Sequence, residues 1–251
     1  MEYISPEEAQ GMAGLRLALT ADVPAPYSMS AKAVFDHHGV SFVPVRQQGG
    51  GRNEALVAWT RHRNAPVAVY NDEAPRIGWL EILNLAERLG TGPSLLPDDL
   101  SARREMIGWT NELIGENGVI WNMRIVMLGL GGPERAAKEA ERNPMYGDYG
   151  YSEEARETAL AKVQETMAGF TEYAAAADER YLAGERLSAL DIYWVYFSQI
   201  FKTLPEELSP TPSYLKKSYD MAGAAFGACN PALIERRDWI LANHLQSPME
   251  F

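Results

Sequence analysis

The chain has 251 residues, of which 46% are hydrophobic and 23% charged, a balance typical of a globular protein with one large domain or two modest ones. Its formal net charge of −11 argues against a nucleic-acid partner, because phosphate binding needs clustered Lys and Arg. A single cysteine, Cys229, excludes an intramolecular disulfide framework and a cysteine-rich zinc site. The N-terminus is acidic and polar, unlike a secretory signal, and the apolar runs are too short to span a bilayer. We therefore expect a cytoplasmic protein without a membrane partner.

The first part of the chain has the pattern of a strand, a loop, a helix and a second strand. Large apolar residues alternate from Leu15 to Leu19, which is the period of a strand, and a breaker-rich loop leads to Pro26. Apolar residues then recur at helical spacing as far as Gly39, and residues 41–45 follow as a second strand. This order predicts a βαβ unit. The unsatisfied N–H groups and the dipole at the start of its helix make a natural seat for a thiolate or carboxylate.

The flanking residues complete a small mixed domain. Residues 1–14 show no clear pattern, so we expect a loose lead-in. A short helix over 54–62, a strand over 65–70 and a short strand at Ile77 follow the βαβ unit. An amphipathic helix over 79–89 then ends at a glycine. The resulting order, β-α-β-α-β-β-α, predicts an α/β domain.

Residues 91–99 contain Pro and Gly and are the best candidate for a linker between domains. Strand signals vanish after this linker. Helices are expected at 100–129, 152–180, 188–204, 212–226 and 231–245. Residues 131–151 are rich in Gly, Pro, Tyr and charge, which predicts a loop or a broken helix over a cleft. We therefore expect an α/β domain over 1–90 and an all-α domain over 100–251.

One helix start is unusually clear. Ser188 and Asp191 have the spacing of an N-cap and its N3 partner, a capping box with the acid shortened from Glu. Leu187 and Ile192 are placed for a hydrophobic staple around this box. The residues that follow are apolar on all sides, so we expect this helix to be the buried centre of the second domain.

Three segments together resemble the cytosolic glutathione transferase superfamily. They are APYSMSAKAVFDHHG (25–39), the tripeptide Ala65-Pro66-Val67 and GERLSALDIYW (184–194). The end of the chain, RDWILANHLQSPMEF, also resembles bacterial and fungal members. The resemblance covers residues 14–251 and implies a thioredoxin-like N-terminal domain followed by a helical-bundle C-terminal domain. It also implies a homodimer and glutathione as co-substrate.

The resemblance places the position of the family's thiol-activating residue in the first loop. That loop supplies a Cys, Ser or Tyr beside the sulfur of glutathione, and here the Ser or Cys position falls on Ala25. Ser28 follows at the helix start, where it either donates a hydrogen bond to a thiolate or simply caps the helix. Tyr27 offers a phenol, or it packs between domains.

Two further positions correspond to the family's glutathione contacts. Pro66 matches the family's cis-proline, and a cis bond would turn the backbone groups of Ala65 toward a peptide-like ligand. Gly78 and Trp79 replace the acidic residue and Ser that hold the γ-glutamyl group, which leaves the backbone N–H of Gly78 as donor. Glu81 either substitutes for the missing acid or lies on the exposed helix face, and Arg76 is a nearby cation for a carboxylate.

The acceptor pocket of such proteins lies between the domains, and this chain supplies large apolar groups for it. The candidates are Met106, Trp109, Trp121 and Tyr149, with Arg124 as the one polar member among apolar neighbours, although a lone Arg is also typical of a surface salt bridge. Residues of these types at helical spacing are also typical of a helical core.

The sequence therefore predicts a glutathione transferase-like enzyme acting on a bulky apolar electrophile. Two alternatives remain, namely a catalytically silent protein of this fold that binds a small hydrophobic molecule or a protein, and an enzyme on this scaffold that no longer uses glutathione. The four histidines lack metal-ligand spacing, and the chain has neither a phosphate-binding loop nor a Gly-x-Ser-x-Gly elbow. We expect no metal.

Overall fold

The computed structural model describes residues 1–177 and 180–251. The chain divides into two compact units. Unit 1 consists of Met1–Ser94 and Gln246–Phe251, and unit 2 consists of Leu95–Leu245. Each unit is described separately below.

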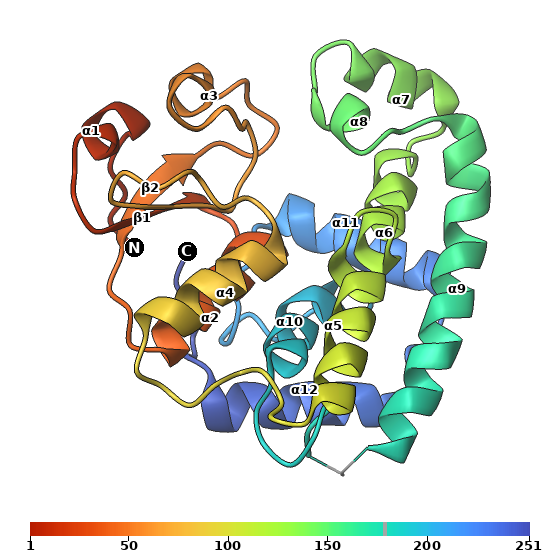
Figure 1. The fold of residues 1–251 in the computed structure, drawn as a ribbon. Coiled ribbons are helices and arrows are strands. Elements are labelled where there is room, and N and C mark those ends of the chain that lie inside the picture. The colour runs from red at the N-terminus through yellow and green to blue at the C-terminus, as the bar shows by residue number, and fades with distance from the viewer. Residues whose placement is uncertain (178–179) are drawn as a thin grey trace. The chain divides into compact units, whose positions relative to one another are not determined.

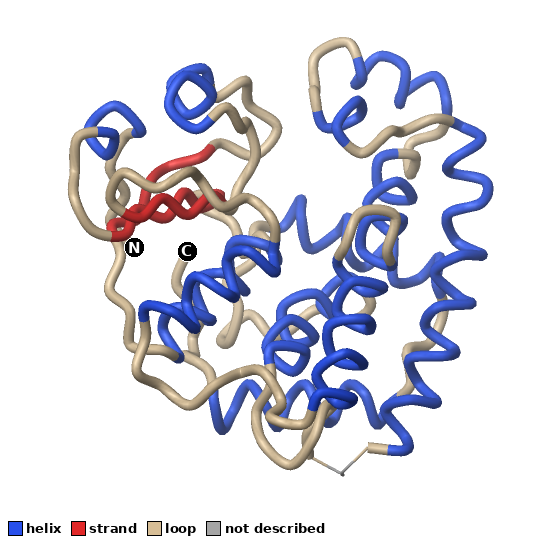
Figure 2. The backbone as a smooth tube through the Cα atoms, in the orientation of Figure 1, coloured by secondary structure: helices blue, strands red, loops and turns tan. Residues whose placement is uncertain are grey.

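Unit 1 is built on a small mixed sheet (Figures 1 and 2). Within the described residues the sheet has three strands in the order β2-β1-β3, with β1 (Leu15–Thr20) in the centre. β1 runs parallel to β2 (Val43–Gln47) and antiparallel to β3 (Val67–Tyr70). The parallel pair confirms the βαβ unit, because its strands need a crossover helix between them.

Helices cover both faces of this sheet (Figure 1). α2 (Pro26–His37) and α4 (Trp79–Leu89) pack against each other, and α2 also contacts β1. On the other face, α1 (Pro6–Gln10) and α3 (Glu54–Thr60) pack together, and α1 contacts β2. Two layers of helix around a mixed sheet give the thioredoxin-like domain that the sequence predicts.

The alternation along β1 produces these two faces. Ala18 belongs to a buried cluster that contains Ala9 of α1 and Leu56 of α3. Arg16 points to this same face, because side chains two residues apart in a strand share a face. It is 3% exposed, donates to the carbonyl of Asn71 at 2.8 Å, and lies 5.6 Å from the centre of the Trp59 ring. Burial lowers the pKa of this guanidinium.

The expectation of a loose lead-in before β1 is wrong. Ile4 forms a parallel bridge with Val45, so it covers part of the outer edge of β2. Ser5 caps α1 and Glu8 reaches back to the Ser5 backbone in a complete capping box. A one-residue bridge has no period, which is why the hydrophobic pattern does not reveal it.

The strand expected at Ile77 is also wrong. An isolated bridge joins Arg76 to Ala68 of β3 instead, with backbone hydrogen bonds of 2.8 and 3.0 Å in the two directions. One pair of hydrogen bonds is too little to define a strand, and Gly78, the N-cap of α4, follows two residues later.

Unit 2 consists of helices (Figure 2). The helix expected over 100–129 is two helices, α5 (Leu100–Ile114) and α6 (Val119–Leu128). Glycines at both ends of the break allow close backbone approach: a Cβ on Gly115 would lie 2.6 Å from the carbonyl oxygen of Asn111, and one on Gly118 would lie 2.6 Å from that of Glu112.

The other helices of unit 2 follow the expected order. They are α7 (Pro133–Ala140), α8 (Met145–Asp148), α9 (Glu153–Ala176), α10 (Ala189–Phe197), the 3₁₀ turn η1 (Ser198–Ile200), α11 (Ser213–Phe226) and α12 (Pro231–His244). α7 and α8 form the broken helix expected within 131–151. Every residue of α10 is buried, and this helix contacts α5 and α12, so it is the buried centre of the unit, as expected.

The predicted capping box at the start of α10 is confirmed. The Asp191 carboxylate accepts the backbone N–H of Ser188 at 2.8 Å, and the Ser188 hydroxyl accepts the backbone N–H of Asp191 at 3.4 Å. A third bond, from the Leu182 backbone N–H at 2.7 Å, satisfies the other carboxylate oxygen. Burial raises the pKa of Asp191 to about 6, although these hydrogen bonds act to lower it.

The last six residues belong to unit 1. Gln246 accepts a hydrogen bond of 3.0 Å from the Lys32 ammonium of α2, and Met249 is 4% exposed. Within the part of the chain that the structure describes, no helix combines the length and the apolar character needed to cross a membrane.

Candidate functional site

A buried polar network lies where the parallel strands of unit 1 end. The Ser28 hydroxyl, on the first turn of α2, accepts the backbone N–H of Thr20 at 2.9 Å. The Thr20 hydroxyl donates to the Gln47 side-chain oxygen at 2.8 Å. The Gln47 side chain is 2% exposed, and its amide donates to the backbone oxygen of Gln48 at 2.8 Å. The carboxyl ends of β1 and β2, where ligands bind in open α/β sheets, are thereby fixed to the helix start.

The network extends to the loop before β3. The Asn53 amide donates to the backbone oxygens of Gln48 at 2.9 Å and Arg63 at 3.1 Å. The Arg63 guanidinium in turn donates to the backbone oxygen of Gly51 at 3.1 Å. Gln47 ends β2 and Asn53 is the N-cap of α3, and a single polar residue at such a position carries no periodic signal in the sequence. Together they hold the residues that lead into Pro66.

The interpretation of Ser28 as an N-cap is wrong. The N-cap of α2 is Ala25, which makes no side-chain bond, and Pro26 occupies the first turn. Proline is preferred there because its fixed φ suits the first turn and it has no N–H to leave unsatisfied. Ser28 is therefore inside the helix, 2% exposed, and its hydroxyl donates to the Thr20 hydroxyl at 3.4 Å. Tyr27 beside it is half-buried.

The Ala65–Pro66 peptide bond is cis, as the sequence predicted. Pro66 is buried directly before β3, whereas Ala65 is half-buried. The bridge between Ala68 and Arg76 lies next to them on the outer edge of β3. Arg76 is paired with Glu73 at 2.9 Å, and the same carboxylate also pairs with Arg88 at 2.6 Å.

The start of α4 differs from the sequence-based expectation. Gly78 is its N-cap, but the Gly78 N–H is not available as a donor, because the Glu81 carboxylate accepts it at 3.1 Å. The same carboxylate oxygen accepts the N–H of Ile77 at 3.2 Å. Trp79 is the first residue of the helix and is half-buried. A carboxylate of the chain itself therefore occupies the anion-binding position of this helix.

Unit 2 places two of the candidate acceptor residues in its core. Met106 of α5 is fully buried. Trp109, one turn later, packs on Phe170 and Tyr173 of α9, with ring centres 5.6 and 5.2 Å apart. Phe170 in turn packs on Trp194 of α10. These contacts agree with the expectation that Met106 and Trp109 pack as residues of a helical core.

The other three candidates come together in what we call the aromatic–arginine patch, defined as Trp121, Arg124 and Tyr149. The Trp121 indole donates to the backbone oxygen of Tyr149 at 3.1 Å, and the two rings lie 4.6 Å apart. The Arg124 guanidinium carbon lies 5.8 Å from the centre of the Tyr149 ring, within cation–π range. All three side chains are half-buried.

Tyr219 of α11 adjoins this patch and was missed in the sequence. It is 2% exposed and has a side-chain hydrogen bond with Arg124. Burial raises the pKa of Tyr219, while the charge and the hydrogen bond of Arg124 act to lower it. A single tyrosine in an expected helix gives no sign of such a contact, since α6 and α11 lie far apart in the sequence.

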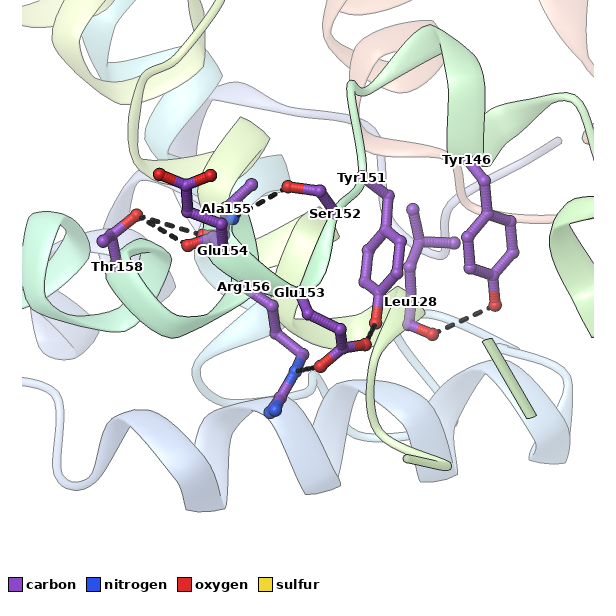
Figure 3. Close-up of polar contacts among 9 residues, drawn as sticks. All are labelled: Leu128, Tyr146, Tyr151, Ser152, Glu153, Glu154, Ala155, Arg156 and Thr158. Atoms are coloured by element: carbon purple, nitrogen blue, oxygen red, sulfur yellow. Dashed lines mark hydrogen bonds and ion pairs between the residues drawn. The ribbon is translucent and has the colours of Figure 1, made fainter. Parts of the chain in front are cut away.

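The turn that carries the tyrosine of the patch is fixed by its own polar contacts (Figure 3). The Tyr146 hydroxyl donates to the backbone oxygen of Leu128, at the end of α6, at 3.0 Å. The Tyr151 hydroxyl donates to Glu153, whose other oxygen pairs with Arg156 at 2.9 Å. Burial is the main cause that raises the pKa of Tyr151 to about 12, so this phenol stays protonated at neutral pH. The turn that carries Tyr149 is thus tied to α6 and α9 by hydrogen bonds on either side of it.

The histidines form no metal site among the residues that the structure describes, where no group of three or more His, Cys, Asp or Glu side chains could hold an ion. The adjacent His37 and His38 rings lie 5.1 Å apart, edge to face. His38 is 2% exposed and contacts Glu87 at 3.2 Å, whereas the His37 ring bonds the backbone oxygen of Pro93 at 2.8 Å. The two rings therefore hold the last part of α4 and the segment after it against the end of α2.

Comparison with known proteins finds likeness in structure alone. No protein-family model and no curated protein sequence matches this chain. A glutathione S-transferase from Xanthobacter autotrophicus Py2 has a TM-score of 0.59 at 16% identity, over 93% of this chain and 96% of that one. The β-etherase LigF from Sphingobium sp. strain SYK-6 has a TM-score of 0.59 at 17% identity, over 89% and 98%.

A third solved structure, a glutathione transferase homologue from Sulfitobacter with bound glutathione, has a TM-score of 0.53 at 16% identity, over 90% of this chain and 98% of that one. Identities this low leave function open, because one fold carries many activities. The matches nevertheless span both units and nearly the whole length of each neighbour. The chain therefore has the glutathione transferase fold, a thioredoxin-like unit followed by an all-helical one.

Proposed function

We propose that unit 1 binds glutathione and that the protein is a glutathione transferase-like enzyme. It joins glutathione to a bulky apolar electrophile, or uses it to isomerise or reduce one. The observation that carries this proposal is the polar network of Thr20, Ser28 and Gln47 at the strand ends, on a fold whose solved members include one with glutathione bound. The residues proposed to contact glutathione are Tyr27, Ala65, Pro66, Gly78 and Trp79.

Two features of unit 1 support a peptide-like ligand. Ala65 precedes β3 and is half-buried, so its backbone groups lie outside the ladder of the sheet, where an extended peptide can pair with them. The network holds the helix start and the loop before Pro66 in fixed positions, so little ordering is needed on binding.

Thiol activation in this proposal comes mainly from the start of α2 and from proximity. Ala25 has no group that could hydrogen-bond a thiolate, and the Ser28 hydroxyl is engaged with Thr20. The helix dipole and the N–H groups of the first turn remain to stabilise the sulfur. The Ser28 hydroxyl contributes modestly, because it can give up its hydrogen bond to the Thr20 hydroxyl and donate to the sulfur instead.

A catalytically silent binding protein is the second candidate. Ala25 favours it because the usual thiol-activating position is empty. Glu81 favours it because this carboxylate occupies the start of α4, where the family's γ-glutamyl contact would lie. Such a protein would bind a small hydrophobic molecule or a protein partner without turnover.

Calorimetric titration with glutathione tests the proposal directly. We expect saturable binding, retained by S-methylglutathione because the peptide part supplies the contacts; an absence of heat at millimolar ligand would refute the proposal.

Turnover with apolar electrophiles then distinguishes an enzyme from a catalytically silent binding protein. Ser28→Ala should reduce turnover with little change in glutathione affinity, and unchanged turnover would exclude a catalytic role for this hydroxyl. We also propose a homodimer in the cytoplasm, and light scattering of the purified chain tests the dimer.

A further inference from the structure

One face of α11 is exposed to solvent. The other face of this helix is buried at Tyr219, Ala222 and Gly223, and the helix contacts α6, α9 and η1 of unit 2 (Figure 1). Residues three, four and seven positions apart share a helix face, so the exposed positions of α11 form one continuous surface. We call it the α11 face and define it by six exposed residues, Tyr214, Lys216, Lys217, Asp220, Met221 and Ala224.

Large apolar side chains are exposed at two positions of the α11 face. Tyr214 is 66% exposed and Met221 is 41% exposed. They are seven residues, or about two helical turns, apart, so they lie on the same edge of the face. No other helix in the described part of the chain exposes two large apolar side chains. Apolar side chains gathered on a surface are typical of a site where another protein docks.

The charge of the α11 face differs from that of the whole chain. A formal net charge of −11 makes two copies of this protein repel each other. The α11 face instead carries two lysines and one aspartate, which line a shallow groove of about 420 Å³ together with Met221. The Asp220 carboxylate is held in place by the Thr203 hydroxyl, which donates to it at 3.2 Å. A second copy therefore meets less repulsion at this face than over the average surface of the protein.

We propose that the α11 face binds the α11 face of a second copy of this chain, with the two helices antiparallel about a twofold axis. In such a pair, residues at equal distances before and after the axis lie opposite each other. The midpoint of Tyr214 and Met221 falls between residues 217 and 218, and that of Lys216 and Asp220 falls at residue 218. One axis therefore serves both pairs.

The two pairs lie on opposite edges of the face, as a twofold contact requires. At about 100° per residue, Tyr214 and Met221 lie on one side of Lys217, and Lys216 and Asp220 lie on the other. The axis keeps like edges together, so each Tyr214 packs on the Met221 of the second copy. On the other edge, each Lys216 pairs with the Asp220 of the second copy. The face is thus complementary to itself in both shape of contact and charge.

The assignment names a surface for the proposed homodimer and does not depend on glutathione binding. One helix from each copy makes a small contact, below the roughly 1,200–2,000 Å² that stable interfaces bury. We therefore expect a dimer that dissociates at micromolar concentrations. Analytical ultracentrifugation of the full chain without glutathione, from nanomolar to high micromolar concentration, measures this equilibrium. A wild-type protein that stays monomeric throughout would overturn the proposal.

Truncation of an apolar side chain locates the contact. Tyr214→Ala should raise the dissociation constant of the dimer at least about tenfold, because the twofold axis removes the side chain from both copies at once. Leu100→Ala is the matched control, since Leu100 is also 66% exposed but lies at the start of α5, and it should leave the constant unchanged. A dimer that is insensitive to Tyr214→Ala would overturn the proposal.

Charge reversal tests the antiparallel arrangement. Lys216→Glu and Asp220→Lys, each alone, place like charges opposite one another and should weaken the dimer severalfold. The double variant has the net charge of the wild type and restores opposite charges across the axis, so it should recover most of the affinity. Lys216→Glu combined with Glu141→Lys has the same net charge, but its second change lies at the exposed end of α7, so it should not recover. Equal recovery in both double variants, or in neither, would overturn the arrangement.

These measurements separate the α11 face from the proposed function. A dimer that persists unchanged in every variant keeps the homodimer but overturns its assignment to α11. A dimer that responds as expected in a protein that does not bind glutathione confirms the α11 face, whereas the transferase proposal falls.

Discussion

Two helix starts in this chain are capped by a carboxylate in opposite surroundings. At α10, Asp191 is fully buried. Its carboxylate accepts the backbone N–H of Ser188, and the Ser188 hydroxyl accepts the backbone N–H of Asp191. At α4, Glu81 is exposed, and its carboxylate accepts the backbone N–H of Gly78, which has no side chain that could accept a hydrogen bond in turn. Both carboxylates satisfy backbone N–H groups that a helix start leaves without partners.

The difference separates a structural cap from a cap that a ligand can displace. Water cannot replace the Asp191 carboxylate, so its loss leaves buried N–H groups unsatisfied. Water or an incoming anion can replace Glu81, because its N–H partners lie at the surface. Stability should therefore depend on the first carboxylate, and ligand affinity on the second.

Asp191→Ala should have the largest effect. It removes the acceptor for the backbone N–H groups of Ser188 and Leu182 in the core of unit 2. We expect a loss of about 3–5 kcal/mol in the free energy of unfolding, measured by urea denaturation at pH 5. Glu81→Ala, the matched change at the exposed cap, should cost about 1 kcal/mol or less. Equal losses would show that burial does not distinguish the two caps.

The stability contributed by Asp191 should fall as the pH rises. Its pKa is raised from 3.8 to about 6 in the folded chain, mainly by burial, so folding favours the protonated form. The favourable contribution is complete below about pH 4 and is lost as the pH rises through 6, a change of roughly 3 kcal/mol.

Asp191→Asn, which does not titrate, isolates this contribution from that of the other carboxylates. The difference in unfolding free energy between the wild type and Asp191→Asn should shift against the wild type between pH 4 and pH 7. A difference that stays constant across this range would contradict a raised pKa.

The main elements of the fold were predictable because the residues that form each of them follow a regular spacing in the sequence. Alternation along β1, helical spacing in α2 and α4, and the Ser188–Asp191 spacing each reflect a local physical rule. The lead-in was not, because Ile4 joins β2 through a single bridge to Val45. The break between α5 and α6 was missed as well, since glycines there act through close backbone approach, which depends on the folded chain.

Ser28→Ala should have an intermediate effect on stability. It removes the acceptor of the Thr20 N–H and disconnects α2 from Gln47, so we expect a loss of about 1–2 kcal/mol in unfolding free energy. Ser30→Ala is the control: its hydroxyl, equally buried, only donates to the Tyr27 carbonyl, and alanine favours the helix. A loss in Ser30→Ala as large as that in Ser28→Ala would mean that helix packing, and not the network, explains the effect.

The candidate site was less predictable than the fold. Ser28 and Pro66 could be named as candidates from the sequence, but the exact start of α2 could not. Pro26 is the first residue of the helix and Ala25 is its N-cap, so Ser28 lies inside the helix. The contacts of Gln47 and Asn53 depend on how the ends of β1 and β2 and the loop before β3 meet in the folded chain. The sequence also names the members of the aromatic–arginine patch, Trp121, Arg124 and Tyr149. It does not show that they lie apart from Met106 and Trp109, because this depends on how α6 and α9 pack.

Glu81→Gln should have the smallest effect, and in the direction of tighter binding. The amide oxygen can still accept the N–H groups of Ile77 and Gly78, so the helix keeps its cap while losing a negative charge. Glutathione carries net negative charge, and a charge at a helix start is worth about 0.3–1 kcal/mol, so its affinity should rise about two- to fivefold. Glu54→Gln, at the start of α3, changes the net charge equally and should leave affinity unaltered. Weaker binding in Glu81→Gln alone would mean that this carboxylate holds the ammonium group of glutathione, and that the exposed cap is part of the binding site rather than a competitor for it.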